Sequence, residues 1–299
     1  MVAGGFRQRG TVINGIFVGL STVDIVYSVD EFPTANSKIV ARGQDVFVGG
    51  PATNASIAFS HLGGKSTLVT TVGRHALAKP IIEEVRRHSI NLIDLNLMFD
   101  SPPVLSSISV NTQGDRNVVS ANATRVSALP AQVDEATLAS ASIVLVDGHY
   151  MQACLSWSRA ARAHGIPVAL DGGSWKNGTD ELLKNIDIAI CSADFLAPGT
   201  STKDDVFHYL RDQGVKDIAI TDGADPVRFF SGEIQGIVEV PTVRLVDTMG
   251  AGDVFHGAFC YYATTNYGFV NALEKAANVA AYSCQFRGTR EWMDPPVAF

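Results

Sequence analysis

The chain has 299 residues, of which 46% are hydrophobic and 18% are charged, and its formal net charge is −7 at pH 7. This length is enough to bury a large core, either as one large domain with an appendage or as two domains. The acidic balance without a basic run argues against binding to nucleic acid or to a membrane surface, and no apolar run approaches the roughly 18–20 residues of a membrane span.

Residues 1–10 contain two arginines but no apolar core of the signal-peptide type, so we expect them to form a disordered tail. The four cysteines stand far apart without C-x-x-C spacing, which favours neither a zinc site nor a disulfide framework. Reduced, buried thiols in a cytoplasmic protein are the expected state of Cys154, Cys191, Cys260 and Cys284.

The first predicted strand is the apolar run at residues 11–20, and Asp24 follows just beyond its carboxyl end. Open α/β sheets bind their ligands at this edge, so the carboxylate of Asp24 is a candidate for binding a substrate. A turn-forming aspartate is the alternative interpretation of the same position.

Two segments alternate loosely between apolar and polar residues, at 25–48 and at 105–121. A period of two is typical of short, partly exposed strands, and the run Gln113-Gly114-Asp115 supplies the turn of a hairpin. Two weak β segments inserted in an α/β chain predict a small separate sheet.

Gly49 and Gly50 precede a predicted helix at residues 55–62. Glycines before a helix allow the backbone to approach a ligand closely, and Asn54 offers both a donor and an acceptor to a pair of hydroxyl groups. An ordinary turn and helix start has the same pattern, so these residues alone leave both interpretations open.

From residue 80 onward, predicted helices and strands alternate with short linkers. This order predicts an α/β fold with a doubly wound, mostly parallel sheet flanked by helices. Asp147 follows the strand at 143–146 and therefore belongs to the ligand edge of that sheet. The other predicted strands are 67–72, 167–170, 186–190 and 218–220, and the other predicted helices are 81–88, 154–164, 182–184, 206–213 and 271–284.

A glycine-rich turn at residues 250–252 follows an apolar run at 238–246, which we predict to be a strand, and precedes a helical pattern. Such a turn leaves several backbone N–H groups without internal partners and, together with the helix dipole, forms a site for an anion such as phosphate. The residues that would surround this anion are Gly250, Ala251 and Gly252.

Asp253 places a carboxylate inside this anion site. It is a candidate general base that takes a proton from a hydroxyl group while the amides hold a phosphoryl group. The alternative is an acidic residue in the first turn of a helix, where it favours the helix dipole. A dinucleotide-binding fingerprint is excluded, because it needs a small residue where Phe255 stands.

The run Asp247-Thr248-Met249-Gly250-Ala251-Gly252-Asp253 resembles the second signature of the ribokinase-like (PfkB-type) carbohydrate kinases. Gly49, Gly50 and Asn54 resemble the first signature, whose residues bind the sugar, and Asp24 stands where relatives hold sugar hydroxyls. The resemblance spans roughly residues 12–290. It implies an ATP-dependent kinase for a hydroxymethyl group of a ribose- or fructose-like sugar, with Mg²⁺ on the phosphates, Asp253 as the base and the amides of 250–253 as the anion hole.

The resemblance also implies the domain organisation. We expect one ribokinase-like domain at residues 11–299, with the segments at 25–48 and 105–121 forming a lid over the sugar. In some relatives this lid pairs with a second subunit, so we expect a homodimer. Relatives often carry an acidic residue at the position of Asp147, which makes it a further candidate for contacting the sugar.

The nucleotide side of the site is also implied by the resemblance. Thr221 and Gly223 resemble the Thr-x-Gly that lies along the nucleotide in relatives, and Gly252 would approach the phosphates. Asn278 stands in a helix of small residues that would leave room for adenine.

Two candidate metal positions follow from the same resemblance. Asp247, together with the segment around Gly288, resembles a loop that binds a monovalent cation in relatives, which makes K⁺ an optional cofactor. At residues 191–194 the chain lacks the Asn-x-x-Glu of ribokinases that helps to organise magnesium, and Asp194 is the carboxylate that remains for a contact through water.

The acceptor is not readable from these residues, because ribose- and fructose-type kinases share all of these parts. A nucleoside kinase of the same fold is a competing hypothesis. A catalytically silent sugar-binding or regulatory relative is another, because it would also tolerate the missing Asn-x-x-Glu. Turnover of ATP with a sugar or nucleoside separates these hypotheses.

Overall fold

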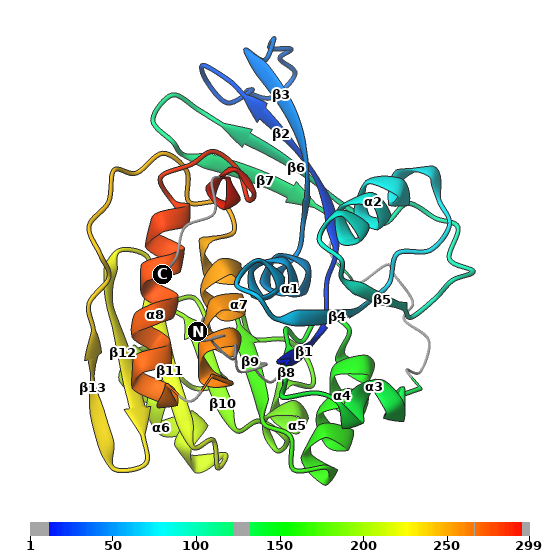
Figure 1. The fold of residues 1–299 in the computed structure, drawn as a ribbon. Helices are drawn as coiled ribbons and strands as arrows, with labels where there is room; N and C mark the ends of the chain where they lie inside the picture. Colours follow the sequence, from blue (N-terminus) through cyan, green and yellow to red (C-terminus); the bar gives the residue numbers. More distant parts are fainter. Residues whose placement is uncertain (1–11, 122, 124–131, 266, 295–299) are drawn as a thin grey trace, which may run out of the picture.

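The computed structural model describes residues 12–121, 123, 132–265 and 267–294, so the predicted tail at 1–10 lies outside the described residues. Within the described part, a large sheet forms the centre of the molecule (Figure 1), and seven of its strands pair in parallel while a hairpin at one edge is antiparallel. Its strands, in spatial order, are β13 (Ile234–Val238), β12 (Asp225–Ser231), β11 (Asp217–Asp222), β10 (Ile188–Ser192), β9 (Val168–Gly172), β8 (Ile143–Val146), β1 (Asn14–Val18), β4 (Lys65–Thr70) and β5 (Asn91–Asp94).

Helices cover both faces of this sheet, as the alternation of elements predicts. Successive residues of a strand point to opposite faces, and β1 shows this directly: Phe17 packs into one apolar core, whereas Ile16 and Val18 pack into the other. The first core is covered by α1 (Pro51–His61), α2 (Lys79–Arg87), α7 (Ala251–Ala263) and α8 (Gly268–Ser283), and the second by α3 (Glu135–Ala139), α4 (Met151–Ala163), α5 (Thr179–Leu183) and α6 (Lys203–Asp212).

The predicted segments at 25–48 and 105–121 contribute to a separate sheet of four strands, which we call the small sheet. It stands above the main sheet in Figure 1, beside the start of α1. Its strands, in spatial order, are β3 (Gly43–Gly49), β2 (Thr22–Ser28), β6 (Val104–Val110) and β7 (Arg116–Ser120). The predicted fold class is therefore confirmed, as a large, mostly parallel sheet flanked by helices with a small sheet beside it.

Helices α1 and α7 pack directly against each other, and this contact aligns the two halves of the site. A β-carbon added to Gly257 of α7 would lie 2.2 Å from the carbonyl oxygen of Ala55 in α1. Any side chain at Gly257 would therefore push the helices apart. The close packing sets the start of α1 beside the first turn of α7.

Two local predictions need correction. The predicted strand at 238–246 is wrong, because β13 ends at Val238 and the following residues form an irregular loop. The loop contains Pro241, which has no N–H for a sheet, and its apolar side chains line a cavity instead of packing between strands. Asp24 does not lie in a turn, because β2 already begins at Thr22. No described helix is long and apolar enough to cross a bilayer.

Candidate active site

The turn at the start of α7 separates two cavities. Gly250 and Asp253 line the first cavity, which has a volume of about 420 Å³, whereas Ala251 and Gly252 line the second, of about 540 Å³. The N–H of Ala251 closes the turn on the carbonyl of Thr248 at 3.3 Å. The next amides of the first helical turn have no acceptor inside the helix, which leaves them available to a ligand at the boundary between the cavities. The four predicted catalytic residues, which are consecutive in the chain, therefore line both cavities.

The first cavity lies between the start of α1, the turn before α7 and the small sheet. Three of its walls carry hydroxyl, amide or carboxyl groups, which suits a ligand with several hydroxyl groups. Among the predicted substrate-binding residues, Asp24, Gly50 and Asn54 line it. The complete lining is Leu20, Thr22, Asp24, Gly50, Pro51, Asn54, Ser106, Ile108, Ser120, His149, Met249, Gly250, Asp253 and Thr289.

Asp24 reaches the first cavity across the backbone of Gly49. A β-carbon at Gly49 would lie 2.1 Å from Oδ2 of Asp24, so a side chain there would occupy the place of the carboxylate. Gly49 does not line the cavity itself; its missing side chain leaves room for Asp24. Burial raises the pKa of Asp24, while hydrogen bonds from Thr22 and Ser106 and the charge of Arg290 lower it.

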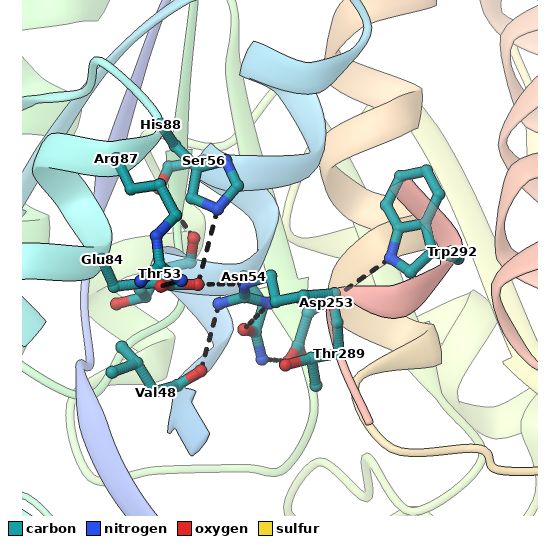
Figure 2. A network of polar contacts seen from close by, with 11 residues as sticks. Val48, Thr53, Asn54, Ser56, Glu84, Arg87, His88, Asp253, Thr289 and Trp292 are labelled. Carbon is teal, nitrogen blue, oxygen red and sulfur yellow. Dashed lines mark hydrogen bonds and ion pairs between the residues drawn. The ribbon is translucent and has the colours of Figure 1, made fainter. Parts of the chain in front are cut away.

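Asn54 holds the carboxylate of Asp253 in a network of polar contacts (Figure 2). Its Nδ2 donates to Oδ2 of Asp253 at 2.7 Å, and its Oδ1 accepts from Nη1 of Arg290 at 3.0 Å. Arg290 in turn donates through Nε to Oε1 of Glu84 at 2.7 Å and through Nη2 to the carbonyl of Val48 at 3.0 Å. Both ends of the Asn54 amide are therefore engaged, which fixes its orientation toward Asp253.

Asp253 has the electrostatic properties of a base that works near neutral pH. Burial raises the pKa of its carboxyl group to about 7, and the charge of Asp171 acts in the same direction. The hydrogen bond from Asn54 and the charge of His256 oppose this rise. A carboxylate with a pKa close to the working pH is the most effective proton acceptor, because it is both available and sufficiently basic.

The second cavity is mostly apolar and lies beside α8. Thr221, Gly223 and Gly252, which were predicted to contact the nucleotide, all line it. The helix contributes the small side chains of Ala277, Ala280 and Ala281, and the loop after β13 contributes Val240, Pro241, Val243 and Leu245. Asn278 does not belong to this lining; its Nδ2 donates to the carbonyl of Glu274 at 2.7 Å on the exposed side of α8.

Asp147 and Asp194 do not line either cavity. The carboxylate of Asp147 is only 2% exposed and accepts from the backbone N–H groups of Leu20 at 2.7 Å and His149 at 2.9 Å. It therefore holds the cavity wall in place. Asp194 is exposed near the end of β10, and the described residues contain no group of three or more His, Cys, Asp or Glu that could hold a metal ion.

Asp247 is already engaged with a cation of this chain. Its Oδ1 accepts from Nη2 of Arg116 at 2.9 Å and from the N–H of Met249 at 2.9 Å, and its Oδ2 accepts from the N–H of Gly288 at 2.9 Å. The same Arg116 nitrogen donates to Oγ1 of Thr248 at 2.7 Å. A guanidinium and two amides occupy this carboxylate, so the residues do not fit a K⁺ ion bound through the Asp247 side chain.

Several residues of the site belong to no sequence motif and were not predicted. Ser106, Ser120 and His149 enter the first cavity because of strand register and loop geometry. Arg290 lies 236 positions from Asn54 in the sequence, so only the fold brings them together. A buried pair formed by Asp171 and His256 lies behind the turn; Asp171 follows the predicted strand at 167–170 and so belongs to the ligand edge of the sheet, but no local pattern pairs it with His256.

Comparisons with known proteins identify the family and the fold of this chain. Residues 15–295 match the family described as pfkB family carbohydrate kinase. A ribokinase of Staphylococcus aureus (strain COL) is 25% identical over 255 residues, which cover 82% of this chain and 84% of that protein. The structure of Arabidopsis thaliana ribokinase complexed with ribose and ATP superposes with a TM-score of 0.77 at 22% identity, covering 93% of this chain and 94% of that one. A putative ribokinase II from E. coli in complex with ATP and Mg²⁺ gives a TM-score of 0.77 at 22% identity, with 94% and 96% covered. The chain therefore belongs to the pfkB family of carbohydrate kinases, phosphotransferases that act on a sugar hydroxyl group.

Proposed function

We propose that this protein is an ATP-dependent kinase that phosphorylates a hydroxymethyl group of a ribose- or fructose-like sugar. The observation that carries the proposal is the turn before α7, which has Asp253 in the first cavity and Gly252 in the second. The hydroxyl-rich first cavity suits the sugar, and the apolar second cavity suits the base of ATP. The related Arabidopsis ribokinase, which binds ribose and ATP, supports the same assignment.

The geometry supports a direct transfer at this turn. The carboxylate of Asp253 accepts the proton of the sugar hydroxyl, and the resulting oxygen forms a bond with the terminal phosphorus of ATP. The bond from that phosphorus to the bridging oxygen breaks, and ADP leaves through the second cavity. Backbone amides at the start of α7 stabilise the charge on the transferred phosphoryl group, which is the main contribution a protein makes to this reaction.

The cofactors of the proposed reaction are ATP and Mg²⁺. When it is bound, Mg²⁺ neutralises the charge of the phosphates, and it prefers to keep several water ligands. Asp194 is exposed after β10 and lines neither cavity, so its carboxylate would reach such an ion only through water. K⁺ has no part in the proposal, because Arg116 already stands beside Asp247. The cytoplasmic location expected from the sequence stays a prediction.

Turnover with a panel of acceptors tests this function. The protein is incubated with ATP, Mg²⁺ and one of several pentoses, hexoses, polyols or nucleosides, and ADP is measured. We expect the highest kcat/KM on a sugar with a free hydroxymethyl group. A nucleoside as the best acceptor would move the assignment to a nucleoside kinase, and binding of sugars without any turnover would indicate a silent sugar-binding protein.

Asp24 is expected to hold the acceptor and not the nucleotide. Replacing Asp24 with Ala should weaken acceptor binding by about 1–3 kcal/mol, the usual result of leaving buried polar partners unmatched. ATP affinity should stay the same, because the residue lines only the first cavity. Calorimetry with each ligand measures both effects. Asp30→Ala removes an exposed carboxylate of the same region and serves as the control; equal losses for both ligands in Asp24→Ala would contradict the assignment.

We further propose that the outer face of the small sheet joins two copies of the chain. Asp24, Ser106 and Ser120 face the first cavity, so the neighbouring residues along each strand point outward. Strand register aligns Val46, Ile25, Ser107 and Val119 in one outward row, in which Val46 is 56% exposed and Val119 is 71% exposed. Among the described residues, strand β7 is the last strand at one edge of the small sheet, and its five residues are all exposed. Natural proteins usually cover such edges, and a second copy would do so.

Replacing Val119 with Lys is therefore expected to weaken the dimer. A charge in the middle of an apolar contact should raise the dissociation constant of the dimer by about 10- to 100-fold, as changes at central interface positions do. Sedimentation equilibrium measures this constant. Leu97→Lys changes a side chain that is 72% exposed outside the small sheet and should leave the dimer intact. A wild-type protein that is monomeric at micromolar concentration would refute the proposal.

A further inference from the structure

His256 lies in the second turn of α7 with both ring nitrogens against carbonyl oxygens. Its Nδ1 is 2.7 Å from the carbonyl oxygen of Gly252, and its Nε2 is 3.1 Å from the carbonyl oxygen of Ile190 in β10. A carbonyl oxygen can only accept, so each ring nitrogen has to donate. Neutral imidazole has one N–H, whereas the imidazolium ion has two. The geometry therefore suits the doubly protonated, positively charged ring.

Asp171, in β9, supplies the opposite charge. Its Oδ2 is 3.5 Å from Nδ1 of His256, and both side chains are only 7% exposed. This oxygen has no hydrogen-bond partner in the described structure, so the imidazolium is the group that faces it. A buried carboxylate is costly unless an opposite charge compensates it. Asp253, in the first turn of α7, is a carboxylate that interacts by charge with both members of the pair, and the charge of Asp147, after β8, also acts on Asp253.

The pair lies directly behind the turn that we assign to phosphate. His256 lines the second cavity, and none of the described residues that line it is a lysine or an arginine. An imidazolium at this point is therefore the positive side chain of the cavity wall. Its bond to the Gly252 carbonyl also holds the peptide between Gly252 and Asp253, in the first turn of α7. Positive charge and fixed amides are what the phosphates of a nucleotide require.

We propose that His256 and Asp171 form a buried imidazolium–carboxylate pair that positions the phosphate-binding turn through the Gly252 carbonyl and gives the nucleotide cavity its positive charge. This inference rests on the proposed function, because it assumes that the second cavity binds ATP. His256 acts here as a positioning residue. Asp171 holds the ring in its charged form, and the charge of the ring in turn reaches Asp253.

Nuclear magnetic resonance tests the charge state without any assay of activity. Protein labelled with ¹⁵N at its histidine rings is compared with His256→Asn to identify the two ring nitrogens of His256. Both nitrogens should carry a proton at pH 7.5, and Asp171→Asn, which removes the counter-charge and keeps the shape, should abolish this doubly protonated state. A ring of His256 that is neutral at pH 7.5 in the wild-type protein would overturn the proposal.

Calorimetric titration tests the consequence for the nucleotide. His256→Asn should weaken ATP binding by about 10- to 100-fold, the range expected for losing a charged partner, and adenosine binding should change far less because it has no phosphate. His164→Asn is the matched control, since the ring of His164 also contacts the carbonyl four residues earlier, at 2.9 Å, but lies on the surface with its side chain 44% exposed.

The outcomes of the titration separate two kinds of failure. Equal ATP affinity in the wild-type protein and in His256→Asn would overturn the role of the pair while leaving the kinase assignment intact. A wild-type protein that binds no ATP would instead remove the proposed function, and the role in nucleotide binding would fall with it, whatever the charge of His256. If His256→Asn does not fold, Asp171→Asn replaces it in the titration, with the same loss of ATP affinity expected.

Discussion

Replacing Asp253 with Asn is expected to lower turnover by about 10²- to 10⁴-fold, the range that general acid–base catalysis contributes. The amide keeps the size of the carboxylate and can still accept the hydrogen bond from Nδ2 of Asn54, which is 2.7 Å in the wild-type protein. It cannot accept the proton of the sugar hydroxyl. The affinity for ATP should be unchanged or slightly higher, because a negative charge close to the phosphates is gone.

The pH dependence of turnover and of stability distinguishes a catalytic role from a structural one. Because the pKa of Asp253 is raised to about 7, wild-type turnover should rise between about pH 6 and pH 8 as the carboxylate forms. A raised pKa means that ionisation weakens the folded state: its contribution to stability is complete below the ordinary pKa of 3.8 and is lost as the pH rises through about 7. Asp253→Asn should therefore be at least as stable as the wild-type protein at pH 8.

A first-turn carboxylate on another helix provides the control. Asp204→Asn removes such a group from the start of α6, where it pairs with Arg228 and lines neither cavity, and it should leave turnover nearly unchanged. If Asp253→Asn keeps most of its turnover on the best acceptor, Asp253 is a helix-terminal aspartate and another group removes the proton. A lower melting temperature in Asp253→Asn would point to misfolding instead.

The sequence is most informative where a local rule sets the structure. The alternation of apolar runs predicts the parallel sheet, because each strand between two helices has to be apolar on both faces, as Phe17 and Ile16 of β1 show. The glycine-rich turn likewise predicts where α7 begins, because small residues let a ligand approach the free backbone amides at the start of a helix. Both features depend on neighbours in the chain, and a single sequence contains them.

The sequence is least informative where distant segments meet. The apolar loop after β13 has the composition of a strand, but its side chains line a cavity. No local pattern in the sequence distinguishes an apolar strand from an apolar cavity wall. Asn54 has the polar groups of a sugar-binding residue, yet its amide nitrogen is bound to Asp253 and its amide oxygen to Arg290. Only the packing of α1 against α7 shows that Asn54 holds the carboxylate of Asp253.

Arg290 is the last residue of this network, and replacing it with Met is expected to affect both stability and turnover. Arg290 and Glu84 form a mostly buried pair. The pKa of Glu84 is lowered to about 2, chiefly by the hydrogen bond from His88 and also by the charge of Arg290, whereas burial acts in the opposite direction. Removing one partner of such a pair costs about 3–5 kcal/mol. We expect the lower end of this range, because Glu84 keeps its contacts with Arg87 and His88.

Turnover should fall by about 10- to 100-fold in Arg290→Met, because the Asn54 amide can rotate once its Oδ1 is released, and small errors in position are costly in catalysis. Denaturant unfolding measures the loss of stability, and steady-state kinetics measures the loss of turnover. The double variant Arg290→Met/Glu84→Gln removes the unmatched charge, so it should regain stability without regaining turnover. Arg287→Met removes a neighbouring arginine that pairs with Asp45 on the surface, and it should change neither quantity by much. Full turnover in a destabilised Arg290→Met would show that Arg290 supports the fold alone, whereas low turnover in the stable double variant would show that Arg290 acts on the site itself, through the position of Asn54 and through its charge beside Asp24 and Asp253.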